Sequence, residues 1–382
     1  MSRNAHKLNL RWTQRSARAD TEATTLGFAA SAGSLSVVET CALYTLVAFL
    51  ALTGNRICAA SFTTLAADTP RAHIVIVEDM YATDAFKPRP DRIEAMVNRG
   101  ITNLTGKVTP REAWLSLVTT QDIVGIKVYS NPGPNSGTRP AVAATVARGL
   151  IAAGLPPKNI VVWDKVETDL RAAGFFDLEE QLGIRVAASA RAGYDETNYY
   201  ETSLIGNLVY GDLEFGKTGD GIGKKSFVSK LVTRQLTKII NLTPLLNHND
   251  AGVCGNLYSL ALGSVDNTLR FEGDAGRLAT AVPEIYALPA LYDRAVLNVV
   301  DALICQYEGG QRGLLHYSVV LDQLRFSRDP VALDMLAIKE LDRQRRNARA
   351  PNVRPNLELY RNAALLELGV SELSKMQIET LR

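Results

Sequence analysis

Short runs of apolar and β-branched residues alternate with segments of helical periodicity from His73 onward, and this alternation restricts the fold more than any other feature of the chain. The pattern predicts buried strands at residues 74–77, 123–129, 160–163, 239–242, 295–300 and 321–326. Helices are predicted at residues 91–98, 111–118, 140–154, 168–173, 229–238 and 251–262. Strand–helix–strand order favours parallel pairing through right-handed crossovers. We therefore expect an α/β domain with a mainly parallel or mixed sheet flanked by helices.

The length of 382 residues allows two average domains or one large α/β domain. We favour a single domain over residues 61–382, because no repeat or low-complexity linker interrupts it. An irregular, glycine-rich excursion is predicted at residues 198–226, and a helical extension at residues 346–382. The formal net charge is only +2, so no overall field draws the chain to nucleic acid, and we expect no nucleic-acid partner.

Residues 1–60 have the features of a leader. Residues 1–34 are basic, residues 41–53 are apolar and uncharged, and small residues follow at positions 59–61. The apolar run is short for a membrane span and is typical of a signal peptide. An uncleaved membrane anchor and a buried helix of a cytoplasmic protein are the alternatives. We expect an exported protein, periplasmic or extracellular, that touches a membrane only through this segment if it is not cleaved.

The four cysteines are Cys41, Cys58, Cys254 and Cys305, and none is spaced for a metal site. A structural zinc ion or an iron–sulfur cluster requires closely spaced thiolates, so neither is expected. Cys254 and Cys305 either form a disulfide in an oxidising compartment or are buried thiols.

Residues 211–218 read GDLEFGKT and satisfy the phosphate-loop pattern letter by letter. That loop works only where a helix starts at the lysine, so that backbone amides meet the phosphates. Glycines at positions 219, 221 and 223 disfavour a helix here, and two acidic residues inside the loop would repel phosphate. We interpret the match as accidental.

A more plausible ligand site lies where the strand 123–129 ends. A loop that leaves the carboxyl end of a parallel strand and enters a helix is the usual ligand crevice of an α/β sheet. Lys127 lies in this otherwise apolar strand, and Asn131 lies in the loop. Burial of an unpaired ammonium group is costly. Lys127 is therefore either a cation directed at a ligand or a strand-edge lysine that reaches water.

The densest polar cluster is Asn247-His248-Asn249-Asp250, between a predicted strand and a glycine-rich helix. A histidine in such a loop can act as a base, an acid or a metal ligand. Alternatively, the cluster caps the next helix. Asp301 ends its strand at an equivalent position, and Asp329 fits the cap of the helix that starts at Pro330. Asp334, one turn later, has no such explanation.

Several segments, in this order, resemble the bacterial and archaeal family known as domain of unknown function 362. They are Val124-Gly125-Ile126-Lys127-Val128, Thr138-Arg139-Pro140, Ile239-Ile240-Asn241-Leu242-Thr243-Pro244, His248 with Gly252-Val253, and Ser327-Arg328-Asp329-Pro330-Val331-Ala332-Leu333-Asp334. The resemblance covers residues 70–345. It implies a single α/β domain that is often exported and sometimes fused to a ferredoxin-like cluster module. This chain lacks that module, and the resemblance implies no settled activity.

The chain departs from the family pattern after the His–Gly-Val stretch. Relatives usually carry a Lys-Asn pair there, whereas Tyr258 and Ser259 stand at the corresponding positions of this chain. If the lysine is catalytic in relatives, this protein has lost or changed that activity.

These interpretations combine into one expected crevice. We predict catalytic roles for His248, Lys127 and Asp301, and ligand contacts from Asn131, Arg139, Asn247, Asp250 and Tyr258. The predicted ligand is a small anion, with a divalent metal held by His248 and carboxylates as a further hypothesis. The cofactor is not specified by the sequence. An enzyme-like domain is the first hypothesis, and a non-catalytic ligand-binding protein or inactive paralogue is the second.

Overall fold

A computed structural model describes residues 72–350 and 356–382 of the chain. The predictions made for residues 1–60 lie outside these ranges. Within the described ranges, no helix is long and apolar enough to cross a membrane.

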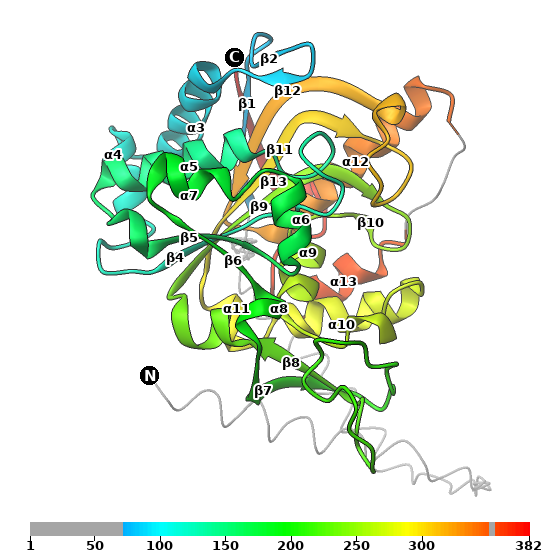
Figure 1. The fold of residues 1–382 in the computed structure, drawn as a ribbon. Coiled ribbons are helices and arrows are strands. Elements are labelled where there is room, and N and C mark those ends of the chain that lie inside the picture. Colours follow the sequence, from blue (N-terminus) through cyan, green and yellow to red (C-terminus); the bar gives the residue numbers. More distant parts are fainter. Residues whose placement is uncertain (1–71, 351–355) are drawn as a thin grey trace, which may run out of the picture. The chain divides into compact units, whose positions relative to one another are not determined.

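The central sheet has the strand order β13-β1-β12-β11-β9-β4-β5-β6 (Figure 1). The bounds are β1 Ala72–Glu78, β4 Val124–Lys127, β5 Ile160–Asp164, β6 Arg185–Ala188, β9 Lys238–His248, β11 Ala295–Gln306, β12 Ser318–Ser327 and β13 Met376–Leu381. Strand β12 runs antiparallel to both of its neighbours, and every other pair along this path is parallel. The predicted α/β class with a mainly parallel sheet is confirmed.

Strand β4 lies inside the sheet, and later strands of the chain are added on both sides of it. After β4 the chain adds β5 and then β6 on one side, and it returns with β9, β11 and β12 on the other side. The strand order thus reverses between β4 and β9. Ligands of open α/β sheets bind in the crevice at the carboxyl ends of the strands at such a reversal.

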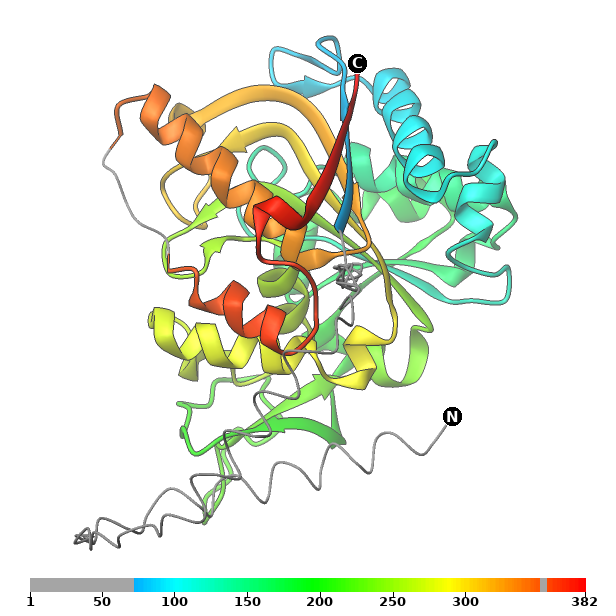
Figure 2. The same cartoon turned by 180° about the vertical axis from the view of Figure 1, so that it is seen from behind.

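Helices cover both faces of the sheet, as the two opposite views show (Figures 1 and 2). One layer holds α3 Pro90–Thr105, α4 Pro110–Leu115, α5 Pro140–Ala153, α6 Glu167–Ala172 and α7 Asp177–Leu182. The other layer holds α9 Asn256–Ser264, α10 Ala275–Tyr286, α11 Pro289–Tyr292, α12 Pro330–Asn347 and α13 Glu358–Leu365. Because successive strand residues point to opposite faces, Ile126 packs in the first layer while Lys127 faces the second.

Local sequence signals explain where several helices begin and end. Thr109 accepts a hydrogen bond from the backbone N–H of Glu112 and starts α4, with Pro110 in the first turn. Helix α5 begins at Pro140 and ends at Gly154, whose φ of 109° lies in the left-handed region that glycine tolerates.

Four regions differ from the prediction. The predicted helix 229–238 is only a five-residue π-helix, Leu231–Gln235, because Ser229 belongs to β8 and Lys238 to β9. Strand β9 continues through His248 and pairs with β10 (Gly252–Val253), so α9 starts at Asn256 and not at residue 251. The glycine-rich excursion joins β7 (Tyr194–Glu201) to β8 (Lys225–Ser229), which form their own small sheet. Residues 346–382 are not simply helical, because β13 joins the main sheet beside β1 (Figure 2). The remaining elements are β2 Thr83–Asp84, β3 Lys87–Pro88 and α8 Ser189–Ala192.

Candidate functional site

A cavity of about 120 Å³ lies at the carboxyl ends of β4 and β5, next to the reversal of strand order. Helix α9, which follows β9, forms its opposite wall. The polar and aromatic residues of the lining are Tyr129, Asn131, Asp164, Lys165, Asp169, Tyr258, Ser259, Glu272 and Gln311. Two predicted ligand contacts, Asn131 and Tyr258, are therefore brought together here. We call this cavity the crevice.

Lys127 lies beneath the crevice and is fully buried. Its Nζ donates hydrogen bonds to Asp164 Oδ1 at 2.7 Å, to the Val128 carbonyl oxygen at 2.7 Å and to Ser259 Oγ at 3.1 Å. All three ammonium donors are thus used inside the protein. Burial lowers the pKa of Lys127, and the Asp164 carboxylate opposes this shift. Lys127 neither reaches water nor lines the crevice. It is therefore neither a cation directed at a ligand nor a strand-edge lysine that reaches water, which were the two alternatives from the sequence.

Asp164 joins the loops that follow β4 and β5. Its Oδ2 accepts hydrogen bonds from the backbone N–H of Ser130 at 2.8 Å and from the Ser130 hydroxyl at 2.7 Å. Its Oδ1 also accepts from the backbone N–H of Lys165 at 2.8 Å. Asp164 was not among the predicted site residues, although an acidic residue directly after a predicted strand is a recognisable signal.

Lys165 provides the cation that the sequence analysis assigned to Lys127. Its half-buried side chain lines the crevice and donates from Nζ to Thr268 Oγ1 at 2.6 Å. Within the described ranges, no carboxylate oxygen lies within 4.0 Å of this Nζ. Burial lowers the pKa of Lys165, while more distant carboxylates, Glu272 foremost, raise it. The ammonium group therefore has a hydroxyl partner but no close counter-ion.

Two buried hydroxyl groups add hydrogen-bond donors to the crevice. The Tyr258 oxygen accepts from Gln311 Nε2 at 2.9 Å, and Ser259 Oγ accepts from Lys127. The described part of the chain supplies no acceptor for the hydrogen of either hydroxyl. Tyr258 is 5% exposed and Ser259 is 2% exposed, so bulk water has little access to them. The Lys165 ammonium group and these two hydroxyl groups are together three donor groups available to a ligand.

His248 stabilises a tight turn behind the crevice. Its Nδ1 accepts hydrogen bonds from the backbone N–H groups of Asp250 at 3.1 Å and Ala251 at 3.0 Å. The ring lies against Tyr258, with 4.4 Å between the ring centroids. Burial lowers the pKa of His248 to about 4, with a smaller opposing effect from Asp250. His248 is therefore neutral near pH 7 and does not line the crevice, so its predicted role as a proton carrier stays a prediction without a ligand-facing position.

Asn247 and Asp250 also lie outside the crevice lining. The Asn247 side chain accepts from Arg345 of α12 and donates to Asn249 Oδ1 at 2.9 Å. Asp250 contributes its backbone N–H to the His248 turn. These residues connect β9 to α12 and shape the turn, so their contacts are structural.

Arg139 and Asp301 form a second buried ion pair away from the crevice. Arg139 Nη1 lies 2.8 Å from Asp301 Oδ1, and the Arg139 backbone N–H donates to Oδ2 at 3.0 Å. The pair holds the start of α5 against β11. Neither residue lines the crevice, so the predicted catalytic role of Asp301 and ligand role of Arg139 lack a ligand-facing position.

Asp334, unexplained by the sequence, caps the amino end of α9. It accepts hydrogen bonds from the backbone N–H of Asn256 at 2.6 Å and of Leu257 at 2.9 Å. Burial raises the pKa of this carboxyl to about 7, and the N–H donors oppose the shift. The contact fixes α9, and with it the wall of the crevice, to α12.

The metal hypothesis gains no support from the described ranges, in which no group of three or more His, Cys, Asp or Glu side chains is placed to hold an ion. Cys254 and Cys305 are both buried free thiols. They lie on opposite sides of β9, because Cys305 pairs with Leu245 while the Cys254 N–H donates to the Leu246 carbonyl oxygen. The buried-thiol alternative therefore describes them.

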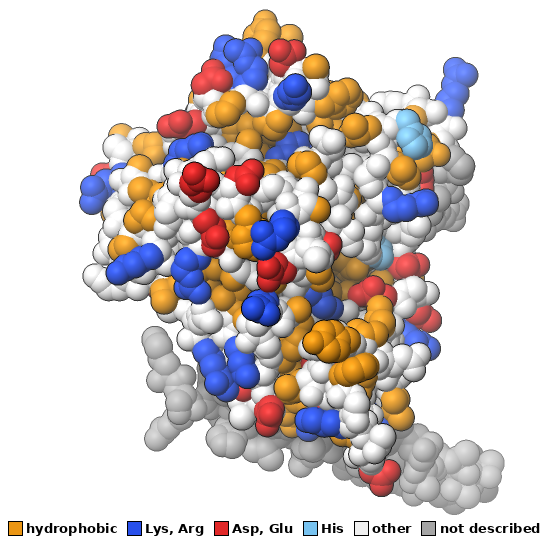
Figure 3. Space-filling model, viewed as in Figure 1, with side chains coloured by type: hydrophobic (Ala, Val, Ile, Leu, Met, Phe, Trp, Pro, Cys, Tyr) orange, Lys and Arg blue, Asp and Glu red, His pale blue; other side chains and the backbone are white. Residues whose placement is uncertain are grey.

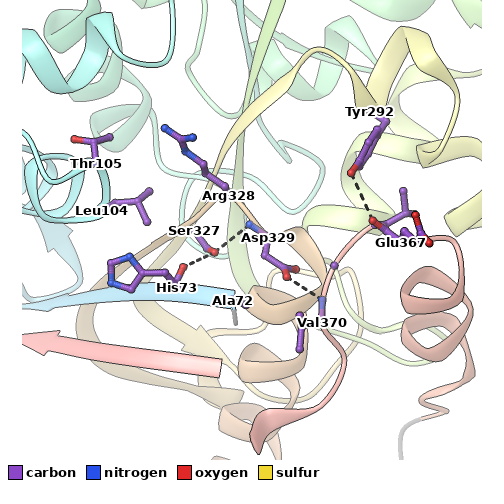
Figure 4. Close-up of a pocket in the computed structure, with 12 residues that line it drawn as sticks. Ala72, His73, Leu104, Thr105, Tyr292, Ser327, Arg328, Asp329, Glu367 and Val370 are labelled. Carbon is purple, nitrogen blue, oxygen red and sulfur yellow. Dashed lines mark hydrogen bonds between the residues drawn. The ribbon is translucent and has the colours of Figure 1, made fainter. Parts of the chain in front are cut away.

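A second, more open cavity of about 560 Å³ lies at the amino end of β1, beside the end of the antiparallel strand β12 (Figure 4). Of the two carboxylate residues in its lining, Asp329 and Glu367, Asp329 accepts hydrogen bonds from the backbone N–H groups of Ala332 and Val370, both at 2.8 Å. The predicted capping role of Asp329 is confirmed. Because ligand crevices of α/β sheets lie at the carboxyl ends, we assign the candidate site to the smaller cavity.

No family model and no curated protein matches the chain. Among solved structures, the chain is similar to the crystal structure of a Thermotoga maritima protein determined by a structural genomics consortium. The sequence identity is 9%, the TM-score is 0.37, and the match covers 70% of this chain and 61% of that chain. The chain thus spans less than two thirds of this neighbour's length. The resemblance to domain of unknown function 362 stays a prediction.

Proposed function

We propose that the protein binds a small anionic ligand in the crevice, with Lys165 as its main charge partner. One observation carries the proposal: Lys165 lines the crevice and has no carboxylate oxygen within 4.0 Å in the described ranges. The free hydroxyl hydrogens of Tyr258 and Ser259 lie in the same lining. An ammonium group and two hydroxyl donors together match the oxygens of a carboxylate or phosphate group.

The volume of the crevice limits the ligand. Sites for drug-sized molecules measure roughly 300–1,000 Å³, whereas the crevice measures about 120 Å³. A ligand of a few non-hydrogen atoms fits this space. Larger anions such as nucleotides do not.

The contacts favour binding without catalysis, which was the second hypothesis from the sequence. General acid–base catalysis requires a group that exchanges a proton near the operating pH and reaches the substrate. Lys127 has all its donors occupied beneath the crevice, and His248 is neutral and outside the lining. The predicted catalytic residues therefore act as scaffold in this proposal.

Isothermal titration calorimetry with acetate, propionate and inorganic phosphate tests the proposal on the wild type, Lys165→Met and Lys158→Met. Lys158 is an exposed lysine away from the crevice and serves as the matched control. We expect Lys165→Met to weaken binding at least tenfold, about 1.4 kcal/mol, and Lys158→Met to leave it unchanged. Equal affinities for all three proteins would reject the proposal.

We also propose that the protein is exported. The proposal rests on the basic, apolar and small-residue order of residues 1–61. Intact-mass measurement of the protein purified from its own host tests it, with a mature chain that begins near Ser61 as the expected result. A mass that includes the basic leader would contradict cleavage, and recovery of this uncleaved protein in the cytoplasmic fraction would contradict export.

A further inference from the structure

We infer that the ligand of the crevice is a short zwitterion, which carries an ammonium group in addition to its anionic group. The inference rests on the proposed function, because it assigns the anionic end of the ligand to Lys165. It adds a second contact region, made by the carboxylates of Asp169 and Glu272.

Asp169 and Glu272 both line the crevice without a cationic partner. Asp169 comes from the first turn of α6 and is half-buried. In the described ranges, neither carboxylate has a cationic nitrogen within 4.0 Å or accepts a side-chain hydrogen bond. Burial raises the pKa of Asp169, and the charge of Asp164 adds to this shift. A half-buried carboxylate in this position gains from a bound cation.

The two carboxylates are close enough to share one ligand with Lys165. Lys165, Asp169 and Glu272 line the same cavity, and the Glu272 carboxylate lies beyond ion-pair distance of Lys165 Nζ. Asp169 lies in the first turn of α6, shortly after Lys165, which directly follows the last residue of β5, Asp164. In a cavity of about 120 Å³, a molecule that contacts Lys165 therefore also lies near these acids.

The formal charges of the lining favour a zwitterion over a simple anion. The negative charge of Asp164 is balanced by Lys127, whose Nζ lies 2.7 Å from Asp164 Oδ1. The lining also holds Lys165 and two unpaired carboxylates, the half-buried Asp169 and the exposed Glu272, so its net formal charge is −1. A simple anion increases this negative charge, and like charges in a partly desolvated site repel. A zwitterion leaves the net charge unchanged and supplies the missing cation.

Matched pairs of ligands separate the inference from the proposed function. Calorimetry compares β-alanine with propionate, and γ-aminobutyrate with butyrate, so that each pair differs only in the amino group. We expect the wild type to bind the amino acid of at least one pair tenfold or more tightly than its matched acid. The Asp169→Asn/Glu272→Gln variant should lose this difference and bind propionate more tightly, because two repelling charges are removed.

Asp177→Asn/Glu180→Gln is the control variant, since both residues are exposed on α7 and outside the crevice. It should keep the preference for the amino acid. Lys165-dependent binding in which neither amino acid binds more tightly than its matched acid would overturn the inference and leave the proposed function standing. A lack of Lys165-dependent binding by every ligand would overturn both.

Discussion

Lys127 Nζ and Asp164 Oδ1 lie 2.7 Å apart beneath the crevice, and the pair joins the carboxyl ends of two adjacent strands. The same carboxylate binds the loop at Ser130, and the same ammonium group binds Ser259 of α9. One ion pair thus positions three of the segments that line the crevice.

Removal of the lysine should strongly destabilise the protein. Lys127→Met leaves the Asp164 carboxylate without its counter-charge, and loss of one partner of a buried ion pair costs about 3–5 kcal/mol. Arg171→Met removes an exposed pair with Glu167 and should cost less than about 1 kcal/mol. Urea denaturation measures both free energies of unfolding. Similar losses for the two variants would show that the buried pair has no special structural role.

Gly263 allows α9 to approach Lys127 closely. A Cβ atom at this position would lie 2.3 Å from Lys127 Cε, so Gly263→Ala must displace the lysine or the helix. We expect a loss of about 1–3 kcal/mol in the free energy of unfolding, as for other overpacked sites. Gly276→Ala, on the exposed first turn of α10 with its nearest contact at 3.3 Å, should be neutral or slightly stabilising. Thermal denaturation that ranks them in the opposite order would contradict this account.

The cap of α9 by Asp334 should contribute more stability than an exposed cap. Asp334→Asn replaces an acceptor oxygen with an amide group, which leaves a buried backbone N–H unsatisfied at a cost of about 1–3 kcal/mol. Asp274→Asn changes the half-exposed cap of α10, where water can replace the lost contact. The loss in the free energy of unfolding of Asp274→Asn should stay below about 1 kcal/mol. Chemical denaturation of the two variants under identical conditions compares these values.

The depressed pKa of His248 predicts a defined dependence of stability on pH. Unfolded histidine binds a proton below about pH 6.5, whereas folded His248 stays neutral down to about pH 4. The unfolded state therefore binds more protons between these values, so the free energy of unfolding falls as the pH falls, by up to about 1.4 kcal/mol per unit.

His248→Asn isolates this effect, because an asparagine oxygen can accept the same turn hydrogen bonds without titrating. The difference in unfolding free energy between wild type and variant should change between pH 6.5 and pH 4 in favour of the variant. A constant difference across this interval would mean that His248 protonates equally in both states.

The fold class followed from the sequence because strand periodicity and helix signals are local. Residues 239–242 and 295–300 were predicted as strands, and the observed β9 and β11 contain them. The extension of β9 to His248 was missed, since it depends on pairing with β10 after a tight turn. Strand β13 was missed for a similar reason, because its alternating, partly exposed residues become a strand only beside β1.

The site was harder to predict because charge pairing is a property of the folded molecule. Asn131 was predicted from its loop at the carboxyl end of a strand and Tyr258 from the family resemblance, and both line the crevice. The sequence could not show which lysine is paired. Lys127 is neutralised by Asp164, 37 residues away in the chain, while Lys165, which directly follows Asp164, has no carboxylate oxygen within 4.0 Å in the described ranges.

The pairing of β1 has a consequence for biosynthesis. Strand β1 lies between β12 and β13, and the hydrogen bond from the Ser327 hydroxyl to the His73 carbonyl oxygen joins residues 254 positions apart. A ribosome therefore releases β1 long before either neighbour exists, and such distant pairings form slowly. Its apolar residues stay without a sheet at least until β12 has been synthesised. This interval gives a chaperone time to engage the chain before it folds.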